Sequence, residues 1–306
     1  MHFFSFISFH HTVILPLESW AGVCYSKNGI RVKKHGNPGG FVISRHEMNP
    51  MWVPIPLGHS GIKAIFTTRH GGVSGSPYNT LNLSFQRADS RENVLENYRR
   101  LSENLGIPLD KMVLSRQVHG SKVTVVDKSH CGMGLIRENT YGDTDGLVTC
   151  ERGVALVTFY ADCTPVYLYD PVAGAIGLVH SGWRSTLMNI SAQAVWKMQE
   201  AFGCKPDNII AVLGPHIRQC CFEVGSDVYR QFVQVFPDMQ HTMKPVGEKW
   251  HIDLSGIIRH TLLQEGLTAG NIRDVGRCTV CEKELFFSHR GGKGSSGTGA
   301  ALLMMM

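Results

Sequence analysis

The stretch VALVTFYADCTPVYLYDPVAGAIGLVHSGW, residues 154–183, decides the fold class because it contains three short apolar runs. Runs rich in Val, Leu, Ile and aromatic residues are typical of buried β-strands. The first run stops just before Cys163, and the third stops at His180. Strands that end at a Cys or His place metal-binding side chains at one rim of a sheet, where functional loops collect. The stretch therefore predicts a sheet with a functional site at its rim.

Strands and amphipathic helices alternate on both sides of this stretch. Four other apolar runs predict strands at 62–69, 122–127, 146–149 and 209–214. In 89–106 apolar residues recur at helical spacing, with Asp89 or Ser90 as the N-cap and Gly106 as the stop. Further helices are expected from about 185 to 203 and near 226–236 and 255–265. This alternation predicts an α/β layered fold with a mixed sheet.

The composition limits the class of protein. With 306 residues, 43% of them apolar and 18% charged, the chain can bury a core in one large domain or two smaller ones. The net charge is +5, but Lys and Arg are scattered and no basic run alternates with aromatics, so we expect no nucleic-acid partner. Nine cysteines lack the density of a secreted disulfide scaffold, which favours a reducing cytoplasm.

The two ends of the chain differ from its middle. The first twenty residues are apolar but lack the positive segment and cleavage site of a secretory signal, and they are too short and polar to span a bilayer. We therefore expect no membrane partner. Residues 1–55 show no period and are predicted to form a poorly ordered leader before a domain at 56–306, with Met48 or Met51 as a possible natural start. The tail, residues 291–306, consists of a Gly- and Ser-rich segment and an apolar cap of uncertain order, and it is not among the predicted strands.

A third candidate metal ligand, His119, follows the shorter run in VLSRQVHG. Two imidazoles and one thiolate, from His119, His180 and Cys163, suit zinc. Three protein ligands leave the fourth tetrahedral position open for water or substrate. Taken singly, a buried Cys is more often a small core residue and a His a hydrogen-bonded structural one.

The Gly-rich segment TTRHGGVSGSPYNTLNLS, residues 67–84, follows the first predicted strand of the domain. Its Arg69 can hold a phosphate or carboxylate through two parallel hydrogen bonds, or it can tie the turn to neighbouring carbonyls. Ser74 and Asn82 can line a substrate pocket or cap the loop. Arg184 can contact phosphate or a neighbouring carboxylate. We leave these alternatives open.

Several motifs together carry a resemblance to a known family. TTRHGGVSGSPYNTLNLS, ENYRRL, QVHG, DGLVT, ADCTPVYLYD, HSGWRST, GPHIRQCCFEVG and CTVC with FFSHR occur here in the order found in the YfiH-type laccase-domain family. The chain resembles this family over residues 60–290. The resemblance implies a three-layer α/β/α fold with a mixed sheet. It also implies that His119, Cys163 and His180 bind one zinc ion.

The chain departs from the family pattern mainly near its C-terminus. Where members usually have FFSYRRDG-x-TGR, this chain has His289 for Tyr, Gly291 for the second Arg and Ala300 for the last Arg. In the HAGWRGT motif it has serines for Ala and Gly, a small change. Roles of the two missing arginines are therefore not expected here.

The resemblance implies zinc-dependent phosphorolysis of purine nucleosides such as adenosine, inosine and methylthioadenosine, with adenosine deamination as a companion activity. In that chemistry zinc orients a reacting oxygen or activates water, and Arg69 would neutralise phosphate. Asp162 is the candidate proton carrier, or else it orients the metal site. The family's older name implies copper-dependent oxidation of polyphenols. We disfavour it because the sequence has no His-x-His pair of the kind that often holds a multicopper cluster.

Two other classes of function stay open. In a cysteine hydrolase, Cys163 would be the nucleophile and His180 or His119 the base. A non-catalytic interaction module would turn over no nucleoside. The chain also has a CxxC at Cys278 and Cys281, for which we expect local packing. A zinc ribbon needs a second such pair, and the adjacent Cys220 and Cys221 do not have that spacing.

Overall fold

The computed structural model describes residues 23–26, 29–32 and 50–306, and the chain divides into two compact units, Met1–Met48 and Asn49–Met306. In the first unit, β1 (Val23–Ser26) and β2 (Gly29–Val32) pair antiparallel. Most of the predicted leader, Met48 included, lies outside the described residues. Its last part contains β3 (Trp52–Pro54), which pairs with the next strand of the second unit.

Two mixed sheets form the centre of the second unit. The larger has the order β15 (Ile272–Asp274), β11 (Ile210–Leu213), β9 (Thr164–Asp170), β10 (Ala175–Ser181), β7 (Gly146–Thr149) and β6 (Val123–Val125). The other has the order β3, β4 (Ile62–Thr67), β16 (Gly299–Met305), β8 (Ala155–Tyr160) and β5 (Met112–Leu114). Both are mixed, because β6 with β7, β11 with β15, and β5 with β8 are parallel and the other neighbours are antiparallel.

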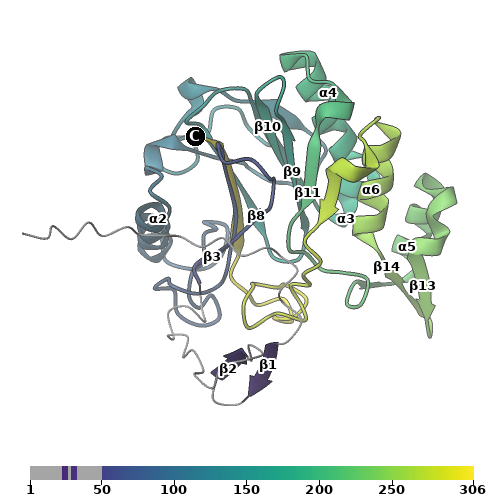
Figure 1. Cartoon of the computed structure of the whole chain (residues 1–306). Helices are drawn as coiled ribbons and strands as arrows, with labels where there is room; N and C mark the ends of the chain where they lie inside the picture. Colours follow the sequence, from purple (N-terminus) through teal and green to yellow (C-terminus); the bar gives the residue numbers. More distant parts are fainter. Residues whose placement is uncertain (1–22, 27–28, 33–49) are drawn as a thin grey trace, which may run out of the picture. The chain divides into compact units, whose positions relative to one another are not determined.

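The two sheets pack face to face, and helices cover both outer faces (Figure 1). Phe66, Leu156 and Leu178 belong to the core between the sheets. This confirms an α/β fold with mixed sheets, but the strands form two stacked sheets where the sequence predicted one. The physical reason is that all residues of β9 are buried. A strand buried on both faces has the same apolar sequence whether a helix or a second sheet covers each face, so the sequence does not give the number of sheets.

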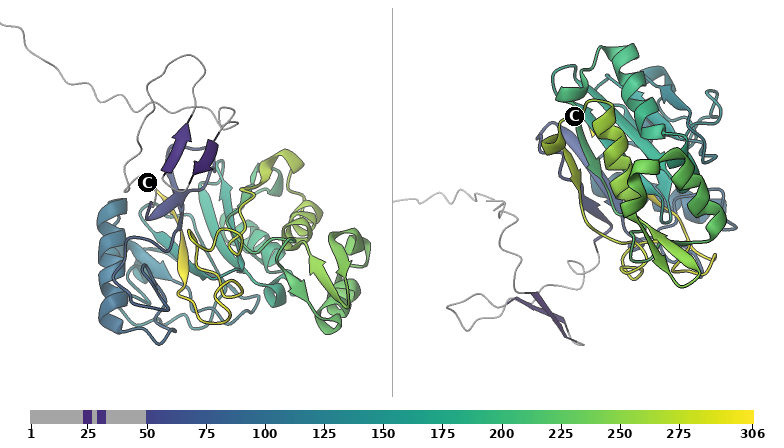
Figure 2. Two further views of the ribbon diagram at one scale, coloured as in Figure 1. Left: turned by 90° about the horizontal axis from the view of Figure 1, so that it is seen from below. Right: turned by 90° about the vertical axis from the view of Figure 1, so that its right-hand side faces the viewer.

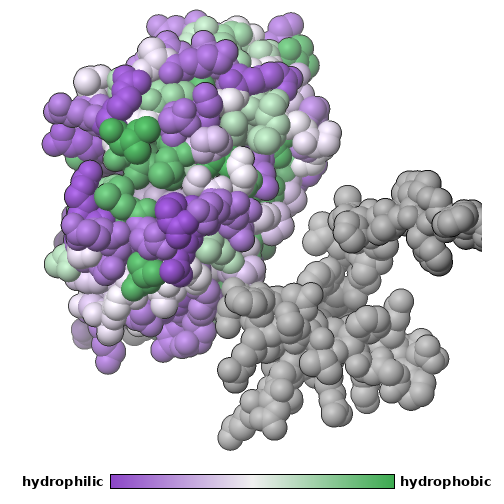
Figure 3. Space-filling view, turned by 90° about the vertical axis from the view of Figure 1, so that its left-hand side faces the viewer, coloured by the Kyte–Doolittle hydropathy of each residue, from purple (hydrophilic) through white to green (hydrophobic). Residues whose placement is uncertain are grey.

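Helix α2 (Arg91–Leu105) packs on the outer face of the five-stranded sheet through Val94, Tyr98 and Leu101. Its caps match the prediction. Ser90 accepts a hydrogen bond from the backbone N–H of Asn93, and Gly106 ends the helix with φ of 69°. The surface on this side mixes hydrophilic and hydrophobic residues (Figure 3), as expected where an amphipathic helix exposes its charged stripe.

The outer face of the six-stranded sheet is covered by α4 (Ile190–Phe202) and α6 (Leu254–Gln264), and the right-hand view of Figure 2 shows these helices in front of the strands. The helix predicted from residue 185 is two helices, because α3 (Trp183–Leu187) is separated from α4 by Asn189 with φ of 55°. Among the described residues, no helix is both long and apolar enough to cross a membrane.

A smaller layer lies beside α6. Helix α5 (Ser226–Val235) shares a core with the three-stranded sheet of β12 (Glu223–Val224), β14 (Lys249–Ile252) and β13 (Met243–Val246). The predicted α5 and α6 are both confirmed within a residue or two. Short 3₁₀ turns complete the connections, at Leu109–Lys111, Lys128–His130, Pro206–Asn208, Pro237–Thr242 and Ala269–Asn271.

The C-terminal tail corrects the sequence prediction most clearly. We predicted no strand there, yet β16 lies between β4 and β8 in the five-stranded sheet, and all of its residues are buried. Its side chains alternate between the core that faces the other sheet, which holds Ala301 and Leu303, and the core under α2, which holds Leu302 and Met304. Methionines and a Gly- and Ser-rich approach give a weak strand signal, whereas burial on both faces stabilises the strand.

Candidate metal centre

The site forms where the chain passes from one sheet to the other. Strand β8 ends at Tyr160, three residues follow, and β9 begins directly after Cys163. His180 lies in the adjacent β10 and pairs across the ladder with Pro165, so its side chain and that of Cys163 share a rim. His119 arrives from the loop after β5. The metal-binding atoms of His119, Cys163 and His180 all lie within 4.8 Å of one another.

A fully buried carboxylate, Asp145, orients His180. The Nδ1 atom of His180 lies 2.8 Å from Oδ1 of Asp145, and its backbone N–H donates to the Asp145 carbonyl at 2.7 Å. Because an ionised carboxylate only accepts hydrogen bonds, Nδ1 must carry a proton, so Nε2 is the ring nitrogen that can bind a metal once its own proton is displaced. Asp145 immediately precedes β7, the strand beside β10.

The same carboxylate shapes the turn that carries His119. Asp145 accepts hydrogen bonds from the backbone N–H groups of Val118, His119 and Gly120, at 3.1, 2.9 and 2.8 Å. His119 has φ of 59°, a left-handed conformation that a non-glycine residue seldom adopts. Three amides that converge on one carboxylate compensate for that strain. Asp145 therefore positions two of the three candidate ligands.

Charge in the cluster favours a thiolate. Burial alone would raise the pKa of Cys163, but the imidazoles of His180 and His119 lower it to about 6. Burial likewise opposes the charged form of His180, whereas Cys163 and Asp145 raise its pKa to about 9. The thiolate is the form of cysteine that binds metals, so protons compete only weakly with a cation for this sulfur near neutral pH.

The space at the cluster is tight and fits a single ion. A Cβ atom added to Gly182 would lie 3.0 Å from Sγ of Cys163 and 3.0 Å from Cδ2 of His119. Sγ of Cys163 and Nε2 of His119 are 3.9 Å apart. These separations suit a four-coordinate ion with bonds of about 2.0–2.3 Å to nitrogen and sulfur. The donor set of two imidazoles and one thiolate therefore fits zinc.

The three ligands line a cavity of about 810 Å³, within the usual range for small-molecule sites. Four aromatic side chains take part in its wall, Phe85, Phe159, Trp183 and Phe222. Four arginines do so as well, Arg87, Arg116, Arg184 and Arg290. Among the described residues that line the cavity, Asp162 has the only carboxylate. The cavity therefore combines flat apolar surfaces with an excess of positive charge.

The model of the family described as multi-copper polyphenol oxidoreductase laccase matches residues 63–306. The chain belongs to this family. It is 38% identical over 243 residues to purine nucleoside phosphorylase YlmD of Geobacillus stearothermophilus, covering 78% of this chain and 88% of that protein. It is also 35% identical over 234 residues to adenosine deaminase RL5 of an unknown prokaryotic organism, covering 75% of this chain and 88% of that protein.

Solved structures agree with the laccase-domain assignment. The crystal structure of YlmD from Geobacillus stearothermophilus is 34% identical, with a TM-score of 0.75, and the match covers 84% of this chain and 96% of that one. The crystal structure of Bacillus licheniformis protein YfiH is 30% identical, with a TM-score of 0.76, covering 80% and 93%. These likenesses support the architecture described above.

Within the laccase-domain fold, Asp162 lies at the cavity wall with a left-handed φ of 96°. Its carboxylate accepts hydrogen bonds from Oγ1 of Thr279 and from the backbone N–H of Arg290, both at 2.7 Å. Its carbonyl accepts a third from the N–H of Ile217 at 2.8 Å. Asp162 thus connects the turn that bears Cys163 to two loops of the cavity wall.

Arg69 is not among the residues that line the cavity. Its Nε donates to the carbonyl of Asn79 at 3.0 Å, its Nη1 donates to the carbonyl of Lys283 at 2.8 Å, and its guanidinium stacks over Phe287. These contacts match the structural alternative, an arginine that ties the Gly-rich turn to neighbouring carbonyls. Its role in phosphate binding stays a prediction that these contacts do not support. Arg184 does line the cavity and lies over the ring of Trp183 at 4.2 Å.

Ser74 and Asn82 also lie outside the cavity lining, although neighbouring residues of the same loop belong to it. Oγ of Ser74 accepts from Asn97 at 2.8 Å. Nδ2 of Asn82 donates to Asp89 at 2.9 Å, and its Oδ1 accepts from the backbone of Thr298 at 3.0 Å. Both side chains are buried and hold the loop together. Direct contact with substrate therefore does not follow from their positions.

Sequence reasoning missed Asp145 and most of the cavity arginines. A signal for Asp145 was present, since it directly precedes the predicted strand 146–149 and so falls at the end of an apolar run, as Cys163 does. Arg116 lies three residues before His119, but nothing in the local sequence distinguishes it from a solvated charge. Only the folded loops bring Arg87 and Arg290 to the same cavity.

Proposed function

We propose that this chain is a zinc-dependent purine nucleoside phosphorylase that converts adenosine, inosine or methylthioadenosine and phosphate into the free base and a ribose-1-phosphate (for methylthioadenosine, its methylthio derivative). One observation carries the proposal: three soft donors converge at the wall of a cavity that also presents aromatic surfaces and four arginines. Relatives named purine nucleoside phosphorylase, at 32–38% identity, support the same reaction class.

The lining of the cavity suits the two substrates. A purine is a flat aromatic ring, for which side chains such as Phe159, Phe222 and Trp183 offer apolar faces. Phosphate is a dianion near neutral pH, and arginine binds it through charge-assisted, bidentate hydrogen bonds. Arg116, which pairs with Asp143, and Arg184 are both exposed, so their guanidinium groups can reorient toward a ligand. Phosphate is therefore expected to bind through arginines of the cavity lining.

His119, Cys163 and His180 would hold the zinc ion, which when bound supplies a Lewis acid that polarises and orients an oxygen. Asp145 keeps the proton on Nδ1 of His180 and holds the His119 turn in place. A phosphate oxygen attacks C1′ of the ribose, the bond from C1′ to the base nitrogen breaks, and its electron pair leaves with the base. The base then takes a proton, and Asp162 at the cavity wall is the proposed carrier.

Adenosine deamination is the proposed companion activity, in which water adds at C6 of the base and ammonia leaves. It uses the same ligands and the same proton carrier, and one relative has the name adenosine deaminase. Copper-dependent polyphenol oxidation is less favoured. The two groups of at least three candidate metal ligands in the described part of the chain contain two imidazoles in total, far fewer than a multicopper oxidase needs.

A cysteine hydrolase is the second candidate, and the geometry gives one reason to retain it. Cys163, His180 and Asp145 are arranged as nucleophile, base and orienting carboxylate. A triad of this kind has no use for a second imidazole on the sulfur, and here Nε2 of His119 lies 3.9 Å from it. We therefore favour the metal over the thiol mechanism. The cysteines of residues 50–306 are free thiols, which supports our proposal of a reducing, cytoplasmic setting.

Metal analysis combined with a product assay separates these functions. The purified chain is incubated with adenosine, with and without phosphate, and adenine, ribose-1-phosphate and inosine are followed. We expect adenine and ribose-1-phosphate only when phosphate is present, from protein that carries zinc. The control is Cys150→Ser, which removes an exposed cysteine outside the site. Metal-free protein that consumes no nucleoside, but whose Cys163 is alkylated rapidly, would refute the proposal in favour of the hydrolase.

A further inference from the structure

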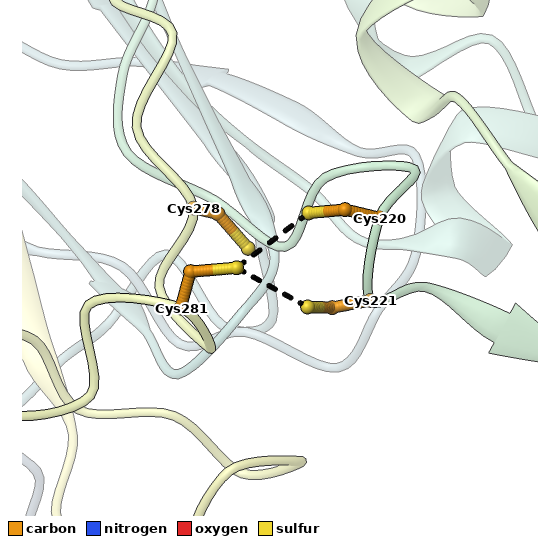
Figure 4. Close-up of side chains that lie close together, drawn as sticks. All are labelled: Cys220, Cys221, Cys278 and Cys281. Carbon is orange, nitrogen blue, oxygen red and sulfur yellow. Dashed lines mark hydrogen bonds between the residues drawn. The ribbon is translucent and has the colours of Figure 1, made fainter.

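A second group of metal-binding atoms lies outside the cavity lining. The thiols of Cys220, Cys221, Cys278 and Cys281 converge, and Figure 4 shows their sulfurs pointing toward one another. Cys220 and Cys221 belong to the turn between β11 and β12, and the other two belong to the turn after β15. The spacing argument against a second pair therefore fails, because the fold supplies that pair from a turn some sixty residues earlier.

The distances fit four thiolates around one ion. Sγ of Cys281 lies 3.7 Å from that of Cys220 and 3.5 Å from that of Cys221, and all four sulfurs lie within 4.8 Å of one another. A tetrahedron with zinc-to-sulfur bonds of about 2.3 Å places its sulfurs about 3.8 Å apart. A disulfide needs about 2.05 Å. Iron–sulfur clusters distribute four thiolates over two or four irons, and thiolates on different irons lie farther apart.

The backbone also holds the two cysteine-bearing turns together. Cys278 pairs with His216 in an isolated β-bridge, which joins the two turns at their base. Cys278 is buried, whereas Cys220 and Cys281 are exposed, so an ion can enter from solvent.

We propose that Cys220, Cys221, Cys278 and Cys281 bind one zinc ion. Four protein thiolates complete its tetrahedral coordination and leave no position for substrate, so this ion is structural. The site is independent of the proposed function, because it needs neither the cavity nor a nucleoside.

The structural role follows from what the two turns hold. Ile217, three residues before Cys220, donates its N–H to the carbonyl of Asp162, and Thr279 donates its hydroxyl to the carboxylate. Ile217 also lines the cavity. A zinc ion that joins the turns would therefore fix one wall of the cavity behind Cys163. Without the ion, the two turns would still be joined by the β-bridge, by these hydrogen bonds and by the ion pair of Arg218 with Asp274.

The test counts zinc in protein expressed with zinc and purified under reducing conditions. We expect about two ions per chain in the unmodified protein and in the control Cys150→Ser, and about one in Cys163→Ser. Cys163→Ser leaves the four-cysteine group untouched, so the ion that it retains reports on that group without any activity assay. The double variant Cys220→Ser with Cys281→Ser, at two exposed positions, should also retain about one ion.

Cobalt supplies a second readout. Cys163→Ser loaded with Co²⁺ should show the visible and charge-transfer absorption of tetrahedral thiolate coordination, and adding the two exposed-cysteine substitutions should abolish it. Folded Cys163→Ser that holds no zinc and gives no such spectrum would overturn the proposal. So would iron with acid-labile sulfide, or a disulfide among the four cysteines after purification in reductant. Loss of phosphorolysis alone bears on the proposed function and leaves this inference intact.

Discussion

The molecule has two groups of metal-binding side chains that differ in composition and surroundings. We call them the cavity group, which consists of His119, Cys163 and His180, and the loop group, which consists of the four cysteines at 220, 221, 278 and 281. The cavity group has three donors of two kinds at the wall of a large cavity, and a tetrahedral ion bound there would have its fourth position open. The loop group has four donors of one kind and no free position. Three mixed ligands are typical of catalytic zinc and four thiolates of structural zinc. The comparison shows that a catalytic metal site differs from a structural one mainly in the number of protein donors and in the access of substrate to the ion. The type of donor matters less.

The two groups also differ in how they are supported. His180 and Cys163 lie at strand ends within a buried core, and Asp145 fixes two of the cavity ligands before any ion binds. The loop group joins two turns outside the sheets, which a β-bridge and the ion pair of Arg218 with Asp274 also connect. Loss of an ion from the cavity should therefore leave the fold intact, whereas loss from the loops should weaken it. The predictions below test this contrast.

The largest effect is expected for Cys163→Ser. The change removes one of three ligands, so kcat/KM for phosphorolysis should fall by about a thousandfold or more. The melting temperature should move little, because the strands around the site keep their packing. Steady-state kinetics and thermal denaturation measure the two quantities side by side, with Cys150→Ser as the matched thiol control. Turnover that stays within tenfold of the unmodified protein would contradict the catalytic assignment.

The opposite pattern is expected for Cys281→Ser. Loss of one of four thiolates should weaken the binding of zinc to the loop group and so destabilise the fold. The expected loss is about 3 kcal/mol, which is the stabilisation that a ligand gives when its free concentration is about a hundred times its Kd. For a domain of this size that is a fall of about 6–12 °C in melting temperature. The value of kcat should change much less than in Cys163→Ser, while KM rises as the wall behind Asp162 loosens. An unchanged melting temperature in zinc-loaded protein would contradict a structural ion.

How far the sequence could predict these sites depends on where their partners lie. His119, Cys163 and His180 each follow an apolar run, so the strand pattern alone places the last two at one rim, and the family resemblance supplies the set. Asp145 has the same signal, but an Asp before a strand is also an ordinary turn residue. The loop group has no such signal, because its four cysteines lie on two turns that are some sixty residues apart in the sequence. The turns meet only in the folded chain, where β11 pairs with β15 and His216 pairs with Cys278.

The fold shows the same limit. Apolar runs located β4 and β6 to β11, because buried strands are built mainly from apolar residues, but they did not locate the short strands β3, β5 and β15. They could not show that the strands divide into two sheets. A strand that is buried on both faces has the same apolar sequence whether a helix or another sheet packs on it. Strand β16 was missed because its run ends in methionines, which fill core space as readily in other structures. The predicted site residues Arg69, Ser74 and Asn82 do not line the cavity, whereas Ser84 of the same segment does, because local sequence does not tell which side chains turn toward the cavity.

A smaller effect is expected for Asp145→Asn, which tests whether Asp145 orients the two histidine ligands before the metal binds. An amide can present its NH₂ group to Nδ1 of His180, so the tautomer that leaves Nε2 free is no longer enforced. Zinc affinity of the cavity group should fall about 10- to 100-fold, as for other changes to residues that orient metal ligands. Competition with a chelator measures this in Cys281→Ser background, where the loop ion does not interfere. The exposed Asp110→Asn is the control, and equal affinity in both variants would remove Asp145 from the site.

The smallest effect compares an arginine of the cavity with one of the loops. Arg184→Gln removes a cation from the lining, so the KM for phosphate should rise about three- to tenfold while the KM for adenosine stays constant. Arg69→Gln removes hydrogen bonds to Asn79 and Lys283 and the stacking on Phe287, and should instead cost about 1–2 kcal/mol of stability. Varying phosphate at saturating adenosine, together with thermal denaturation, separates the two outcomes. If Arg69→Gln raised the KM for phosphate more than Arg184→Gln did, the loop arginine would have to reach the cavity when substrate binds. Arg69 would then be a phosphate-binding residue, and its assignment to a structural role would be wrong.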